Sequence, residues 1–123
     1  MNQIRIKTDR VEILAELQDT PTSKALLDAL PCESSASTWG EEVYFSVPIS
    51  VDLEADARQV VEPGTVCFWV EGNAVALPYG PTPISVGDEC RLISEVNVVG
   101  KVLGDPRQLD KINQADRITI EAV

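Results

Sequence analysis

The sequence contains no histidine, and this absence excludes a large part of enzyme chemistry. Without histidine there is no Ser-His-Asp triad, no Cys-His nucleophile pair and no zinc site with a histidine ligand. The general acids and bases that remain are Asp, Glu, Lys, Tyr and Cys. The three cysteines, Cys32, Cys67 and Cys90, stand far apart and form no Cys-x-x-Cys motif. We therefore expect free thiols in a reducing compartment, a cytoplasmic location, no bound metal and no cofactor.

Basic residues and long apolar runs are also scarce. Ten Lys and Arg stand against 20 Asp and Glu, which gives a net charge of −10, and the basic residues are scattered. We therefore expect no nucleic-acid partner, because phosphate binding needs clustered positive charge. Residues 1–14 alternate charged and aliphatic side chains, unlike a signal peptide, and no apolar run is long enough for a bilayer. We expect one domain over residues 1–123 that has no membrane partner and forms a monomer or a small homo-oligomer.

What the sequence does contain is a series of short segments in which aliphatic residues alternate with polar ones. They predict a hairpin over residues 4–17 and strands over 43–49, 65–70, 74–79, 90–103 and 116–123, with a bulge or bend at Gly100. Residues 32–38 and 52–62 are polar or acidic and are predicted as loops. Short capped helices are predicted near residues 21–30 and 106–113.

This order of six to eight strands and two short helices has no βαβ spacing. It predicts a mostly β fold: a small, closed or nearly closed antiparallel β-barrel with helices near its ends. Strands at both ends of the sequence are expected to pair with each other, which removes an exposed sheet edge.

Three stretches resemble the atypical cyclophilin-like family of small bacterial and archaeal proteins. They are TWGEEVYFSVPISV (38–51), ARQVVEPGTVCFWVEGNAVALPYGPTPIS (57–85) and SEVNVVGKVLGD (94–105). The resemblance extends from the N-terminal hairpin through the last helix and implies a compact β-barrel of cyclophilin-like topology. It implies no particular biochemical role, since none is established for the family.

The resemblance does not bring prolyl isomerase residues with it. Typical cyclophilins surround the bound proline with an Arg, a Gln, aromatic residues and a His. This sequence has no His and no match to the motif around the catalytic Arg; Arg91, for example, lies in ECRLIS, which is unlike the family pattern. Fold alone does not establish function.

The first candidate site is the start of the strand at 43–49. Strand alternation puts Glu41 on the same face as Val43 and Phe45, with Trp39 one step further out. If that face is the barrel interior, Glu41 is a partly desolvated carboxyl at the barrel mouth, beside an indole, and could act as an acid or base. Gly40 would let a ligand approach closely. The alternative is that Glu41 lies in a solvated loop.

The second candidate site is a groove on the outer face of the sheet. Trp69 lies opposite Phe68 in its strand, and Tyr44 also faces away from the core, so both could contact a ligand. Tyr79 and Thr82 flank Gly80 and Pro81 and could present hydroxyl groups to the same ligand. The alternatives are that a helix covers the rings and that residues 80–83 are a rigid crossover.

These observations favour a binding module for a small molecule or short peptide, with ligand-binding residues Trp39, Glu41, Tyr44, Trp69, Tyr79 and Thr82. The alternative is an enzyme, either a divergent peptidyl-prolyl isomerase or a carboxylate-dependent hydrolase or lyase. A third possibility is a subunit that works only within an assembly.

Overall fold

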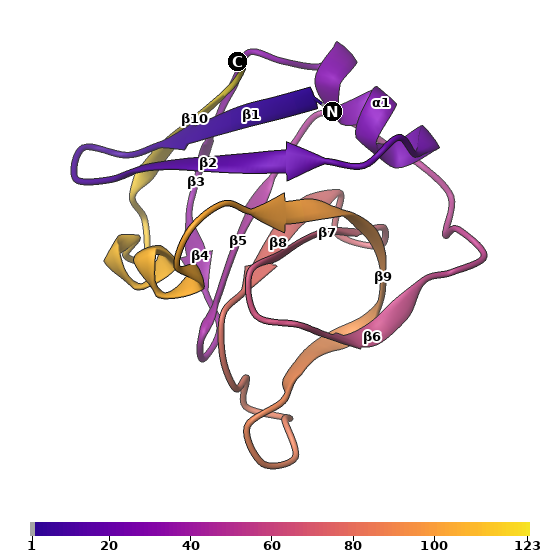
Figure 1. Cartoon of the computed structure of the whole chain (residues 1–123), viewed down its shortest axis with the longest axis vertical. Coiled ribbons are helices and arrows are strands. Elements are labelled where there is room, and N and C mark those ends of the chain that lie inside the picture. Colours follow the sequence, from indigo (N-terminus) through magenta and orange to yellow (C-terminus); the bar gives the residue numbers. More distant parts are fainter. Residues whose placement is uncertain (1) are drawn as a thin grey trace.

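The computed structural model describes residues 2–123 and consists mainly of short β-strands (Figure 1). In chain order the elements are β1 (Asn2–Lys7), β2 (Glu12–Leu17), α1 (Pro21–Asp28), β3 (Cys32–Ser35), β4 (Ser37–Thr38), β5 (Glu42–Ser46), β6 (Arg58–Val61), β7 (Thr65–Trp69), β8 (Ala74–Pro78), β9 (Cys90–Val102), the 3-10 helix η1 (Pro106–Lys111) and β10 (Arg117–Ala122). Neither helix is long and apolar enough to span a membrane within the described residues.

The strands form one antiparallel sheet that curves into a nearly closed barrel. Their order is β3-β10-β1-β2-β9-β7-β8-β5-β4, with β6 paired to β9. The two strands at the ends of this order, β3 and β4, are separated in sequence by Ala36 alone, so the chain itself joins the two edges. The Ala36 amide donates to the carbonyl of Asp116, and its carbonyl accepts from the amide of Ala115, both at 2.8 Å. The predicted fold class and the pairing of the terminal strands β1 and β10 are confirmed.

The barrel interior is a mainly aliphatic core with two phenylalanines. Inward-facing side chains from the strands are almost completely buried, among them Ile4, Ile6, Ile13, Leu17, Phe45, Phe68, Leu77, Ile118 and Ile120. Leu26 of α1 and Leu109 of η1 join the same core. Strand alternation explains this packing, because every second residue of each strand faces inward.

The helix α1 is fixed to the barrel by its own capping residues. The Thr20 side chain accepts from the Ser23 amide, and Pro21 occupies the first turn, where its missing N–H costs nothing. Ser23 Oγ then donates to the carbonyl of Val99 at 3.0 Å, which ties the helix to β9. This helix ends at Asp28, before the predicted end at residue 30.

A second, smaller core lies on the outer face of β5, β7 and β8. The long strand β9 changes register next to Gly100: Val66 pairs with Gly100 but Cys67 pairs with Val98, which leaves Val99 unmatched. The predicted irregularity at Gly100 is therefore confirmed. The first half of β9, which precedes this irregularity in the chain, pairs with β6 and curls over the outer face of the sheet (Figure 1). The residues buried there are Val61, Cys67, Ala76, Cys90, Leu92 and Val96.

Two loop predictions were wrong, one of them in part. Residues 52–57 form a loop as predicted but residues 58–61 form the strand β6, and residues 32–38 contain β3 and β4. Both segments are rich in polar residues because each strand has one face in contact with solvent. Their order comes from pairing with β9, β10 and β5, and local sequence preference is a weak guide to such strands.

Candidate functional site

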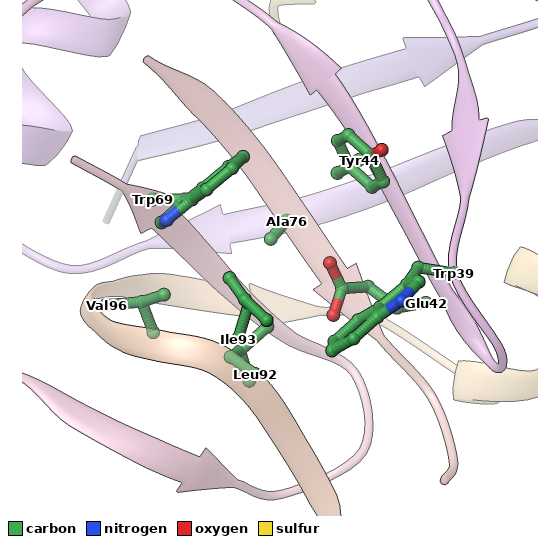
Figure 2. A pocket seen from close by; sticks show the side chains of 8 residues that line it. All are labelled: Trp39, Glu42, Tyr44, Trp69, Ala76, Leu92, Ile93 and Val96. Carbon is green, nitrogen blue, oxygen red and sulfur yellow. The ribbon is translucent and has the colours of Figure 1, made fainter. Parts of the chain in front are cut away.

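A pocket of about 180 Å³ opens on the outer face of the sheet, between the barrel wall and the curled half of β9 (Figure 2). Its lining is aromatic and aliphatic except for one carboxyl group. The lining residues are Trp39, Glu42, Tyr44, Trp69, Ala76, Leu92, Ile93 and Val96.

Strand alternation and register bring these side chains together. In β5, Val43 and Phe45 enter the barrel core, so Glu42 and Tyr44 project from the outer face. Ala76 of β8 is paired with Tyr44 on one side and with Cys67 of β7 on the other. Ala76 therefore forms the floor of the pocket, and its small side chain leaves room above it.

Three aromatic residues form the walls. The rings of Tyr44 and Trp69 meet edge to face, with centroids 6.4 Å apart and planes at 87°, an arrangement that aromatic pairs favour. Trp69 Nε1 donates to Ser94 Oγ at 3.1 Å, which fixes the indole against β9. Gly72 lies directly behind this ring, since a Cβ at that position would be 2.2 Å from the indole Cε3. Trp39 lies on the other side of the pocket, next to Glu42 (Figure 2).

Glu42 is the polar group of the pocket. Its residue is only 6% exposed, and Oε1 is buried without a hydrogen-bond partner among the described residues. Burial raises the pKa of Glu42 from 4.5 to about 7, because a desolvated carboxyl group resists ionisation. The backbone is well held, since Glu42 pairs with Pro78 and its carbonyl accepts from the Trp39 amide at 3.0 Å. Near neutral pH this carboxyl can therefore accept or donate a hydrogen bond.

Glu41, which sequence reasoning preferred, projects from the opposite side of the chain and is not among the lining residues. Its Oε2 forms an ion pair with Arg107 Nη2 at 2.9 Å, and its side chain lies against Gly80. Arg107 in turn lies over the ring of Tyr79, 5.1 Å from its centroid. The Tyr79 hydroxyl donates to Asp110 Oδ1 at 3.4 Å. Glu41 and Tyr79 thus belong to a separate cluster near η1.

Thr82 is also engaged elsewhere. Its Oγ1 donates to the carbonyl of Arg91 at 2.5 Å, and its amide donates to Ser85 Oγ at 2.9 Å. Gly40 packs against the same segment, because a Cβ there would lie 2.9 Å from the Pro81 carbonyl oxygen and from Pro83 Cδ. The close approach at Gly40 is therefore made by residues 81–83 of the chain itself.

Of the six predicted residues, the structure brings Trp39, Tyr44 and Trp69 together in one pocket, and sequence reasoning missed Glu42. A signal for it was present, because Glu42 has the same strand parity as Tyr44. What the sequence lacked was any indication that β6 and β9 would cover this face and desolvate the carboxyl group.

The cysteines add no nucleophile to the site. All three are free thiols, and burial raises the pKa of Cys67 far above its ordinary value, with the charge of Glu42 adding to the effect. Burial likewise raises the pKa of Cys90 to about 11. Both thiols stay protonated at neutral pH and behave as small apolar side chains. Across residues 2–123, no three Cys, Asp or Glu side chains gather in a way that would hold a metal ion.

With this geometry in view, comparison with known proteins gives the family. A family model described as Cyclophilin-like matches residues 2–121, and the chain belongs to this family. The solution structure of a hypothetical protein from Archaeoglobus fulgidus is similar, with 33% sequence identity and a TM-score of 0.81. The match covers 98% of this chain and 93% of that one. The search among curated proteins found no match.

Proposed function

We propose that this protein is a binding module for a small molecule that occupies the pocket on the outer face of the sheet. One observation carries the proposal: Glu42 lines an aromatic cavity, and its Oε1 is buried with no hydrogen-bond partner in the described part of the chain. A buried polar atom without a partner costs about 1–3 kcal/mol. A ligand that hydrogen-bonds to Glu42 offsets this cost.

The size of the pocket suits a small ligand. A cavity of roughly 150 Å³ can hold a molecule the size of benzene, and the present pocket measures about 180 Å³. Its apolar lining with one polar anchor is the usual character of a small-molecule site. Trp39, Tyr44 and Trp69 would contact the body of the ligand, Ala76 would lie beneath it, and Glu42 would fix its orientation.

The second candidate function is carboxylate-dependent catalysis, in a hydrolase or lyase. It is favoured by the pKa of Glu42, about 7, which suits a general acid or base. Against it, the residues that line the pocket in the described chain offer no second carboxyl group and no lysine or cysteine thiolate. A binding function, in contrast, needs only the aromatic walls and the single carboxyl group that line the pocket.

The test is a ligand-detected NMR and thermal-shift screen of small neutral, cationic and anionic compounds. A ligand at 100 times its dissociation constant stabilises the protein by about 2.7 kcal/mol, which is easily detected. Ala76→Leu fills the floor of the pocket and should abolish binding of every true ligand. Glu41→Gln is the matched control, since its side chain lies outside the pocket. If Ala76→Leu unfolds the protein, Trp39→Ala replaces it. Ligands that bind equally to wild type and these pocket variants would overturn the proposal, as would a screen without hits.

A further inference from the structure

We infer that the pocket on the outer face of the sheet takes a small organic ammonium cation, whose positive group lies between the aromatic walls and Glu42. The inference rests on the proposed function and names the class of ligand for that same site. It follows from the charges around the pocket and from the chemistry of its walls.

The charges around Glu42 leave it without a positive partner. The lining residues include no Lys or Arg, and Glu42 belongs to no ion pair within residues 2–123. Burial raises the pKa of the Cys67 and Cys90 thiols on β7 and β9, so both are neutral near pH 7. The other ionisable side chain of the lining is Tyr44 of β5. The charge of Arg58 on β6 reaches Cys67, but Arg58 is exposed and pairs through its backbone with Val96. The described residues supply no positive charge to pair with an ionised Glu42. A ligand with a positive group could supply this counter-charge.

The aromatic walls favour the same ligand. The face of an aromatic ring attracts a cation, by about 2 kcal/mol or more when water is excluded, and Trp attracts it most strongly. Two tryptophans and a tyrosine surround the pocket, and the Glu42 carboxyl group points toward its middle (Figure 2). The net charge of −10 also raises the concentration of cations near the surface. An anion would meet a carboxylate in a lining that holds no Lys or Arg to compensate its charge, and a fully apolar ligand would leave Oε1 unsatisfied.

A cationic ligand would couple its binding to the ionisation of Glu42. Burial raises the pKa of Glu42 to about 7, so below this pH most of the free protein carries a neutral carboxyl group. A bound cation favours the charged carboxylate and lowers that pKa again. Binding below pH 7 therefore releases a proton, and affinity should rise as the pH passes upward through about 7.

The experiment compares choline and tetramethylammonium with their neutral carbon isosteres, in which a quaternary carbon replaces the nitrogen. Dissociation constants are measured by NMR titration at about pH 5.5 and about pH 8.5, on either side of the Glu42 pKa. We expect the cations to bind at least about tenfold more tightly than the isosteres at the higher pH. Lowering the pH or introducing Glu42→Gln should remove most of this preference, while Glu41→Gln should retain it.

The outcomes separate this inference from the proposed function. If the neutral isosteres bind as well as the cations, and Ala76→Leu abolishes their binding, the pocket is a ligand site but the cation class is wrong. If no cation of the series binds, the inference is overturned, and the neutral compounds of the screen decide the proposed function. A cation preference that Glu42→Gln leaves unchanged would show that Glu42 does not confer it, and would also overturn the inference.

Discussion

Glu41 and Glu42 are adjacent in the sequence, yet they occupy opposite environments. Glu41 is partly exposed and paired with Arg107, whereas Glu42 is buried beside Trp39 and its Oε1 has no hydrogen-bond partner among residues 2–123. The difference arises from alternation along β5 and from the cover that β6 and β9 place over one face only. The two residues therefore make a natural pair of test and control.

The buried carboxyl group of Glu42 should make stability depend on pH. Its pKa is about 7 in the folded protein and near 4.5 in the unfolded chain, so the folded state binds more protons between these values. Stability should therefore fall as the pH rises from about 4.5 to about 7, and the loss should be complete above that range. The change in pKa corresponds to roughly 3 kcal/mol, at about 1.4 kcal/mol per tenfold change in acid dissociation constant.

Glu42→Gln should remove this dependence, because the amide is never charged. We expect the variant to be more stable than wild type by roughly 2–3 kcal/mol at about pH 8, and to equal it near pH 4. Urea unfolding across the pH range measures the difference. Glu41→Gln should change the free energy of unfolding by less than about 1 kcal/mol, since it removes only a surface ion pair. Equal stability of Glu42→Gln and wild type at about pH 8 would contradict the burial of an ionised carboxyl group.

The ring of Trp69 depends on the absence of a side chain at Gly72. A Cβ there would lie 2.2 and 2.3 Å from Cε3 and Cζ3 of the indole, so Gly72→Ala should push the ring out of place. The hydrogen bond from Nε1 to Ser94 should weaken, and ligand affinity should fall while the fold is retained. The indole N–H signals in an NMR spectrum provide the measurement. Only the Trp69 signal should move, and Trp39 serves as the internal control.

At the scale of elements, the bend of β9 determines whether the pocket exists. Gly100 lies where β9 passes from β2 and β7 toward β6, and a Cβ there would be 2.1 Å from the carbonyl oxygen of Glu16 and 2.9 Å from Leu17 Cα. Because both contacts are with backbone atoms, they cannot move aside as a flexible side chain could.

Gly100→Ala should therefore destabilise the protein by about 3 kcal/mol or more, as severe overpacking does. Denaturant unfolding gives the value. Gly87→Ala is the control, because no atom lies within 4 Å of the new Cβ and only the left-handed backbone, with φ of +67°, is unfavourable. That control should lose about 1 kcal/mol. Equal losses for the two variants would show that the contact between β2 and β9 is looser than described.

Some of the structural elements could be predicted from the sequence, and others could not. The hairpin of β1 and β2, the strands β7 and β8 and the irregularity at Gly100 follow from local patterns of alternation and from a single glycine. The strands β3 and β6 do not, because their polar residues become ordered only by pairing with β10 and β9. Because β6 and the paired half of β9 also bury Glu42, the burial of this residue could not be predicted from local sequence patterns either. The aromatic walls could be predicted, but the buried carboxyl group could not.

At the scale of the whole molecule, family membership does not imply prolyl isomerase activity. The chain has no histidine, and Arg91 holds Glu89 in an ion pair at 2.5 Å. We expect no acceleration above background in a chymotrypsin-coupled assay with proline peptides, with an active cyclophilin as the positive control. Robust turnover by the pure protein would contradict this expectation.

The floor of the pocket has a consequence for how such a barrel can diversify. Ala76 is 1% exposed and faces the outer cluster, while its neighbours Val75 and Leu77 fill the barrel core. A larger residue at this position would project from the outer face of β8 and reshape the pocket, whereas the side chains of Val75 and Leu77 project from the other face. Descendants of a single barrel could therefore acquire or lose ligands by one substitution on the outer face, at the cost in stability that overpacking of the outer cluster brings.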